Sequence, residues 1–313
     1  MSEPKALLGP MRLPFLVLPP ACVFLAFGTA LWTEGGIDAL YLILAFVGAV
    51  AAHIGVNALN EYFDFVSGLD KRTQRTPFSG GSGTLPARPE MARPALYLGL
   101  LTMALAGSIG IYFLFVRGLA LLPLGVLGLV LIYTYTRWLT RSPLLCLVAP
   151  GLGETAWRMA LDMGAGLGFG PLMVMGTDFV LTGTYTWTAF WASLVPFFLV
   201  SNLLLLNQFP DIEADRSVGR RHYPIVSGRK ASSYIYAAFM LGAYLSLVIG
   251  VALDQLPLTS LLGLLTLVIA VPTLRGVLLH AEDLEQLMPS LGLNVILTVT
   301  LPILTGTGLL IAA

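Results

Sequence analysis

Long apolar segments alternate with short polar segments along the whole chain. Nine apolar runs are present, at about residues 13–33, 39–60, 94–115, 119–136, 153–176, 188–208, 231–253, 257–279 and 288–311. A helix needs about 20 residues to cross the hydrocarbon core of a bilayer, and each run reaches or approaches that length. The pattern predicts an all-α, polytopic membrane protein with about nine transmembrane helices. We expect a single integral membrane domain over residues 1–313, with the first apolar run part of the fold rather than a cleaved signal.

Composition and charge support this prediction and add an orientation. The chain is 57% hydrophobic and 11% charged, with a mean hydropathy of +0.84, outside the range of soluble domains. With the N-terminus in the cytoplasm, the loops on that side hold almost all basic residues, and the opposite loops hold only Arg117. The positive-inside rule therefore predicts a protein of the cell membrane with its N-terminus and its polar loops cytoplasmic. We find no nucleic-acid-binding motif.

Two of the polar segments share a pattern. Asn60 and Asp64 stand four residues apart at the end of one apolar run, and Asn207 and Asp211 repeat that spacing at the end of another. The two pairs are related by one offset of 147 residues, which also relates Pro77 to Pro224. Acidic residues are costly at the edge of a bilayer, so two matched clusters indicate a functional site. The repeat predicts two pseudo-repeated halves that each contribute ligands to one site.

Helical geometry indicates how these ligands are presented. Residues four apart lie on one helix face, so Asn60 stacks above Asp64. We expect Asn207, Asp211 and Asp215 to form one acidic stripe over two helical turns. Gly68 allows a turn that returns Asp70 toward Asp64.

These ligands predict a magnesium site that binds a diphosphate. Asn and Asp oxygens without His or Cys favour hard cations such as Mg²⁺, which is commonly shared between carboxylates and substrate phosphates. Basic side chains beside the motifs would contact the phosphate oxygens. An amphipathic diphosphate with its tail between the helices fits this arrangement. The expected metal ligands are Asn60, Asp64, Asp70, Asp211 and Asp215, and the basic candidates are Lys71, Arg72, Arg75, Arg220, Arg221, Arg229 and Lys230.

The two motifs resemble those of a known family. NEYFDFVSGLD, residues 60–70, and DIEADRSVGRR, residues 211–221, are similar to the aspartate-rich motifs of the UbiA superfamily of intramembrane prenyltransferases. Within it they resemble the naphthoate prenyltransferases of menaquinone synthesis, as do residues 151–154 and 169–177. The resemblance implies Mg²⁺-dependent transfer of a polyprenyl group from its diphosphate to an aromatic acceptor. Glu61 stands where the family often has Asp, and Arg158 and Asp162 are not typical of this branch.

The resemblance also implies roles for individual residues. Asn60, Asp64, Asp211, Lys71 and Arg72 would assist departure of the diphosphate. Aromatic faces can stabilise an allylic cation in a dry pocket by about 2 kcal/mol or more. The further substrate-binding candidates are Asn207, Tyr62, Tyr133 and Tyr135.

Several alternatives remain open at this point. The acceptor could instead be a hydroxybenzoate, a glycerol phosphate lipid or a chlorin. A cation transporter could use the acidic pairs, although transporters place such residues near the bilayer midplane. Among the other polar residues, we expect His53 to be a hydrogen-bonded packing residue, His222 to be solvated, and Glu61 to be a secondary candidate.

Overall fold

The structure is a computed structural model that describes residues 6–71, 73, 76, 80–134 and 164–313. Its long helices are α2 (Leu18–Glu34), α3 (Ala39–Val66), α5 (Ala92–Arg117), α6 (Leu122–Thr134), α10 (Trp187–Asn207), α12 (Tyr223–Ala252), α13 (Leu267–His280) and α14 (Leu284–Ala312). The 3₁₀ segment Leu258–Thr266 precedes α13. Between α6 and α10, a further long segment consists of α8 (Gly164–Leu167), a π-helical segment (Gly168–Met175) and α9 (Gly176–Thr182). The short helices α4 (Thr84–Ala87) and α11 (Ile212–Ser217) lie in the polar loops.

The helical prediction is confirmed. In the described part of the chain, eight helical segments are long and apolar enough to cross a membrane, and the shorter segment Leu119–Tyr133 adds a ninth apolar helix. The fifth segment ends at Thr182 rather than near residue 176, because Gly183 stops it with a left-handed φ of 86°. Its predicted start, Arg158, Asp162 and residues 151–154 lie outside the described residues. The chain folds as a multi-pass helical membrane protein.

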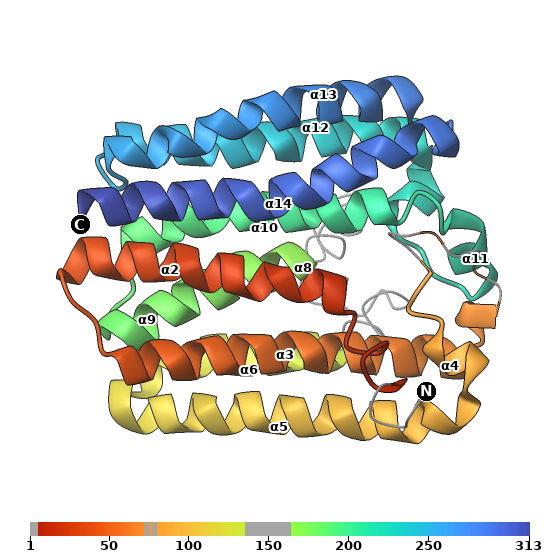
Figure 1. Ribbon diagram of the computed structural model, residues 1–313, viewed down its shortest axis with the longest axis horizontal. Coiled ribbons are helices and arrows are strands. Elements are labelled where there is room, and N and C mark those ends of the chain that lie inside the picture. The colour runs from red at the N-terminus through yellow and green to blue at the C-terminus, as the bar shows by residue number, and fades with distance from the viewer. Residues whose placement is uncertain (1–5, 72, 74–75, 77–79, 135–163) are drawn as a thin grey trace, which may run out of the picture.

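The helices run side by side, and both motif helices end at the same end of the bundle (Figure 1). We call this the motif end; α4, α11 and the N-terminal segment lie there, and the C-terminus lies at the opposite, distal end. Each motif helix is followed by a short helix in a loop and then by a long helix packed against it, α5 on α3 and α12 on α10. This shared order accords with two pseudo-repeated halves.

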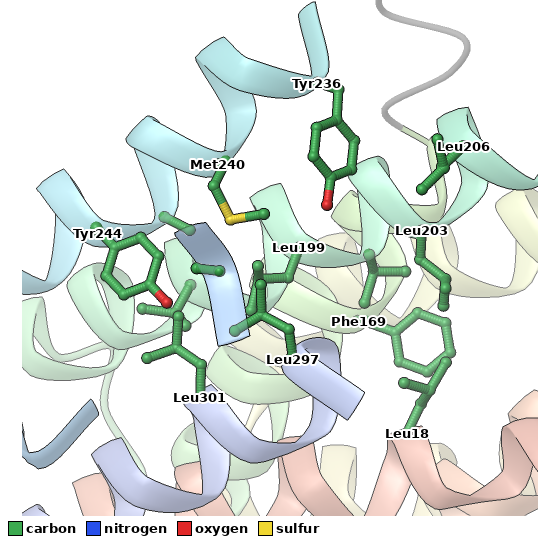
Figure 2. Close-up of a cluster of buried hydrophobic side chains, with 14 of the residues drawn as sticks. Leu18, Phe169, Leu199, Leu203, Leu206, Tyr236, Met240, Tyr244, Leu297 and Leu301 are labelled. Atoms are coloured by element: carbon green, nitrogen blue, oxygen red, sulfur yellow. The ribbon is translucent and has the colours of Figure 1, made fainter. Parts of the chain in front are cut away.

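One half of the bundle is tightly packed. Leu199 and Leu203 of α10, Met240 of α12, and Leu297 and Leu301 of α14 interdigitate in the cluster that Figure 2 shows. All five are under 5% exposed. Burying side chains of this size stabilises the fold by about 1.5–3 kcal/mol each. This core makes α10 a firm support for the second motif.

The distal end carries a smaller apolar cluster, which we call the distal plug: Ala45, Phe113, Leu121, Phe179 and Val180. Arg117, at the end of α5, joins two of its helices. Arg117 Nε donates to the Val180 carbonyl at 2.8 Å, and Arg117 Nη2 donates to the Leu181 carbonyl at 2.6 Å. Its guanidinium also lies 4.8 Å from the centre of the Tyr41 ring. The one basic residue predicted for this side therefore ties α5 to α9.

Candidate active site

The first motif has the predicted geometry. Asn60 and Asp64 lie one turn apart in the continuous helix α3, and both line the same cavity. The helix ends at Val66, and Gly68 turns the chain with a φ of 77°. Asp70 follows in the short turn Leu69–Lys71 and returns to the cavity wall.

The second motif differs from the predicted stripe. Helix α10 ends at Asn207, and Asp211 is the N-cap residue of a separate short helix, α11, which contains Asp215. Pro210 explains the break, because proline lacks an N–H donor and disfavours helical geometry in the residue before it. Asn207, Asp211 and Asp215 all face the cavity nevertheless. The single continuous stripe was wrong, but the convergence of its three members is observed.

Both motifs line one cavity of about 680 Å³. The five predicted metal ligands and the substrate-binding candidate Asn207 lie in its wall and come from opposite halves of the bundle: Asn60, Asp64, Asp70, Asn207, Asp211 and Asp215. The cavity continues past them between α3, α5, α6 and the π-helical segment, where its walls are mainly aliphatic side chains and glycine. It reaches the distal plug at Ala45 and Phe113. A polar mouth thus opens into a long apolar interior.

Arg220 links the two motifs across the mouth. Its Nη2 donates to Asp64 Oδ1, and its Nη1 donates to Asp215 Oδ1 at 2.9 Å. His222 Nε2 lies 2.8 Å from the other oxygen of Asp215. Burial alone would raise the pKa of Asp215, but the hydrogen bond with His222 and the charge of Arg220 outweigh it and hold that pKa below its usual value. The acidic site therefore contains its own counter-ion.

His222 corrects one expectation. It was predicted to be solvated, but it is only 8% exposed because its partner Asp215 is itself buried in the cavity wall. A loop position in the sequence does not reveal such a contact.

The donors at the mouth fit a hard cation. Asn207 Oδ1 is buried and has no hydrogen-bond partner among the described residues, so an acceptor is available there. Asn207 and the five predicted metal ligands all present oxygen, the donor type that Mg²⁺ prefers. In the described part of the chain, however, no three His, Cys, Asp or Glu side chains are grouped tightly enough to hold a metal ion. Arg220 explains this, since its guanidinium occupies the space between Asp64 and Asp215.

Two further site residues were missed or undervalued. Glu61 is fully buried and accepts hydrogen bonds from Arg12 Nε at 2.8 Å, from Ser82 N at 2.7 Å and from Ser82 Oγ at 2.7 Å. Arg12 lines the cavity and has a left-handed φ of 50°, unusual outside glycine. Burial opposes its charge, but Glu61, Asp64 and Asp70 raise the pKa of Arg12 above its usual value. In the sequence, the one indication of this pair was Glu61 standing where the family often has Asp.

Replacing Glu61 by alanine is expected to destabilise the fold by about 2 kcal/mol. A buried ion pair broken on one side costs roughly 3–5 kcal/mol, and the value is reduced here because Arg12 keeps access to solvent and to two aspartates. Thermal unfolding of purified protein in detergent measures the change. Glu90→Ala is the matched control, because Glu90 is 65% exposed in its pair with Arg88 and its loss should leave stability unchanged. Equal unfolding temperatures for Glu61→Ala and Glu90→Ala would contradict the anchoring role.

The remaining predicted residues are distributed unevenly. Arg221 lines the cavity. Arg229 Nε donates to the Phe209 carbonyl at 3.1 Å, and Lys230 Nζ donates to the Leu278 carbonyl at 2.7 Å, so the structure does not bring these two to the mouth. Tyr62 and Tyr133 pack edge-on against Phe63 and do not line the cavity that the described residues form. Arg72, Arg75, Tyr135 and the side chain of Lys71 lie outside the described residues.

The chain is similar to several known proteins. The 1,4-dihydroxy-2-naphthoate octaprenyltransferase of Bacillus subtilis is 28% identical over 210 residues, which are 67% of this chain and 62% of that enzyme. The solved apo structure of a UbiA homolog from Aeropyrum pernix K1 superposes with a TM-score of 0.67 at 19% identity, covering 96% of this chain and 98% of that one. A UbiA homolog from Archaeoglobus fulgidus bound to DMAPP and Mg²⁺ has a TM-score of 0.50 at 15% identity, covering 96% and 99%.

The solved structures show that the fold is shared. Because their sequence identities are low, they show the fold alone. The family match extends much further along the sequence than the two motifs. Residues 21–286 match the UbiA prenyltransferase family, a span that includes both aspartate-containing motifs. The chain belongs to the UbiA prenyltransferase family.

Proposed function

We propose that the protein transfers a polyprenyl group from its diphosphate to an aromatic acceptor of the 1,4-dihydroxy-2-naphthoate type. One observation carries the proposal: aspartates from both halves meet at the mouth of one cavity whose interior is apolar. An amphipathic diphosphate needs both environments next to each other. The naphthoate acceptor rests on the activity of the Bacillus subtilis relative and on the motif resemblance.

The mouth supplies the charges that bind a diphosphate. Mg²⁺, held by Asn60, Asp64, Asp70, Asp211 and Asp215, would neutralise the negative charge of the leaving diphosphate. The relative bound to DMAPP and Mg²⁺ supports this choice of ion. Arg12, Arg220 and Arg221 line the same mouth and would donate to phosphate oxygens. Arg220 now neutralises Asp64 and Asp215, and phosphate oxygens can accept from the same guanidinium.

The interior controls the reactive intermediate. The bond between carbon 1 of the prenyl chain and the diphosphate oxygen breaks, and its electron pair leaves with the diphosphate. A ring carbon of the acceptor then bonds to carbon 1 and loses a proton or carbon dioxide. Apolar walls exclude water, which would otherwise capture the allylic cation. Phe15 and Phe169 in the cavity wall offer aromatic surface near the mouth.

We also propose that the motif end faces the cytoplasm of a cell membrane. Arg12, Arg220 and Arg221 line the mouth and Arg229 lies in the first turns of α12, whereas Arg117 lies at the end of α5 beside the distal plug. The positive-inside rule assigns the more basic end to the cytoplasm. The soluble diphosphate product would then be released where it can be hydrolysed and reused.

A cation transporter is the weaker interpretation. Asp64 stands two residues before the end of α3, and Asp211 lies beyond the end of α10. Transporter sites are found near the bilayer midplane, about half a helix away from these positions. Among the described residues, no acidic side chain lines the cavity beyond the mouth.

The test is release of diphosphate by purified protein given geranylgeranyl diphosphate, with and without Mg²⁺, over a panel of aromatic acceptors. We expect Mg²⁺-dependent release that requires a dihydroxynaphthoate. Release only with a hydroxybenzoate or a glycerol phosphate lipid would keep the prenyl transfer and overturn the acceptor. Ion flux that is lost in Asp64→Asn and Asp211→Asn while prenyl transfer persists would overturn the enzyme proposal.

A further inference from the structure

His53 lies in the wall of the cavity without a hydrogen-bond partner. It stands on α3 two turns before Asn60, and it is 6% exposed. Neither ring nitrogen makes a hydrogen bond of normal geometry to a described residue, although the backbone of Phe15 lies within range of a longer hydrogen-bonding contact. The expected packing is observed, but a hydrogen bond of normal geometry to the ring is not formed among the described residues. Its ring instead stands edge-on to Phe169, with 5.0 Å between the ring centres.

An unpartnered imidazole at this position is costly to the protein. A buried polar group without a hydrogen bond costs about 1–3 kcal/mol, and most buried polar groups in folded proteins have a partner. Leucine or methionine would fill the same space in an apolar wall at no such cost. A ligand that enters the cavity and hydrogen-bonds the ring would remove the cost in the bound state.

The position of His53 defines which part of a ligand it meets. The other titratable side chains in the described cavity wall lie at the mouth, and His53 alone lies in the interior. Seven residues of helix separate it from Asn60, or about 10 Å along α3 at a rise of about 1.5 Å per residue. A diphosphate bound at Asn60 and Asp64 with its chain extending into the interior would place carbon 1 on the His53 side of Asn60. An acceptor that attacks carbon 1 must lie at the same depth.

The surroundings of His53 suit an aromatic ring with a hydroxyl group. Phe169 and Phe15 line the cavity beside it and provide flat apolar surface. Asn57, one turn toward the mouth, uses its amide nitrogen to donate to the Met11 carbonyl at 3.1 Å, which ties the N-terminal segment over this region. A phenolic hydroxyl is a strong donor and acceptor that a neutral imidazole nitrogen can pair with inside an apolar wall.

We propose that His53 is the positioning residue for the acceptor: its imidazole hydrogen-bonds a phenolic hydroxyl and so directs a ring carbon toward carbon 1 of the prenyl chain. The inference rests on the proposed function and identifies a contact within the same cavity. His53 accepts or donates one hydrogen bond and takes up no proton during the transfer. A site built to pair with a hydroxyl discriminates strongly against an analogue that lacks it.

Equilibrium binding tests this contact without catalysis. Dissociation constants are measured for 1,4-dihydroxy-2-naphthoate and for the two analogues that each lack one hydroxyl, in the absence of prenyl diphosphate. We expect the wild-type protein to bind one analogue about 10-fold more weakly than the diol, which corresponds to loss of one buried hydrogen bond of about 1.4 kcal/mol. His53→Phe should bind the diol and that analogue with equal affinity. Relative to the wild-type protein, its affinity should fall for the diol and stay unchanged for the analogue. His53→Gln, which retains a polar group, should recover part of the preference.

Several results would overturn the proposal. Equal binding of all three naphthoates by the wild-type protein would exclude a hydroxyl contact without any variant. A uniform loss for every naphthoate in His53→Phe would assign the residue to packing, as would loss of monodisperse protein in both His53→Phe and His53→Gln. His280→Phe is the matched histidine control at the end of α13 and should leave the preference unchanged.

The same design separates this inference from the proposed function. Wild-type protein that binds the diol selectively but transfers no prenyl group would refute the transferase and keep the His53 contact. Transfer that proceeds with equal preference in wild type and His53→Phe would refute the contact and keep the transferase.

Discussion

Asp64→Ala is expected to lower prenyl transfer by about 1,000-fold or more while the protein still folds. Asp64 is 5% exposed, lines the cavity mouth and accepts a hydrogen bond from Arg220. Removing one preorganised electrostatic contact to a transition state commonly costs 100- to 1,000-fold, and loss of a metal ligand would add to that. The same loss is expected for Asp211→Ala, because Asp211 supplies the second half of the site.

The fold should survive this change because the charge of Arg220 keeps a partner. Arg220 Nη1 donates to Asp215 at 2.9 Å, so the guanidinium is not left unpaired when Asp64 is shortened. A buried charge that loses its only partner would instead cost about 3–5 kcal/mol. Monodisperse Asp64→Ala protein in detergent, together with lost diphosphate release, would establish a functional role. Aggregated protein would point to a structural role for Asp64.

Glu213→Ala supplies the matched control. Glu213 lies on α11 between Asp211 and Asp215, but its side chain is 79% exposed and pairs with Arg216 on the surface. Its removal deletes one carboxylate charge close to Asp211 and should change the rate by less than about twofold, because exposed pairs contribute little. A comparable loss in Glu213→Ala would show that net charge near the mouth matters more than the individual ligands do.

The first motif could be predicted from the sequence because its geometry is local. Asn60 and Asp64 share an uninterrupted helix, so their spacing alone places them on one face. The second motif contains Pro210, and the predicted stripe ignored the helix break that proline causes. Pro210 is itself a sequence signal for the end of α10 before Asp211.

The contacts of Arg12 and His222 could not be predicted in the same way. Arg12 reaches Glu61 across 49 residues of sequence, and the pairing depends on how the N-terminal segment folds over α3. His222 meets Asp215 only because Gly219, with a φ of 81°, turns the chain back after α11. Positive charge near a motif gave no means of separating Arg220, which reaches the mouth, from Arg229 and Lys230, which do not.

The second large effect is expected at the distal end of the cavity, where Gly110→Leu should shorten the longest prenyl chain that the protein accepts. Gly110 lines the cavity, and a Cβ atom added there would meet no described atom within 4 Å, so a side chain would project into open space. Gly48 faces Ile109 across the α3–α5 contact, which puts Gly110 about 24 Å along α3 from Asp64 at about 1.5 Å per residue.

The length of the cavity sets the scale of this effect. Nineteen residues of α3 separate Asp64 from Ala45 in the distal plug, or about 28 Å at about 1.5 Å per residue. An extended chain advances by roughly 1.2 Å per bond, so an isoprenyl unit of four backbone bonds advances by about 5 Å. About five units would therefore fit between the mouth and the plug. A leucine at position 110 occupies space near the fifth unit and should spare chains of two or three.

Chain-length profiles measure the outcome, with kcat/KM determined for diphosphates of two to eight isoprenyl units. For chains that reach Gly110, overpacking of about 1–3 kcal/mol predicts a loss of roughly 5- to 150-fold, with no change for shorter chains. Gly36→Leu is the control, because it adds the same side chain at an exposed loop position where nothing lies within 4 Å. Phe113→Ala should act in the opposite direction by opening the distal plug to a further unit. Identical profiles in wild type, Gly110→Leu and Phe113→Ala would mean that the tail leaves the cavity sideways between the helices, and the distal plug would then have no part in selecting the substrate.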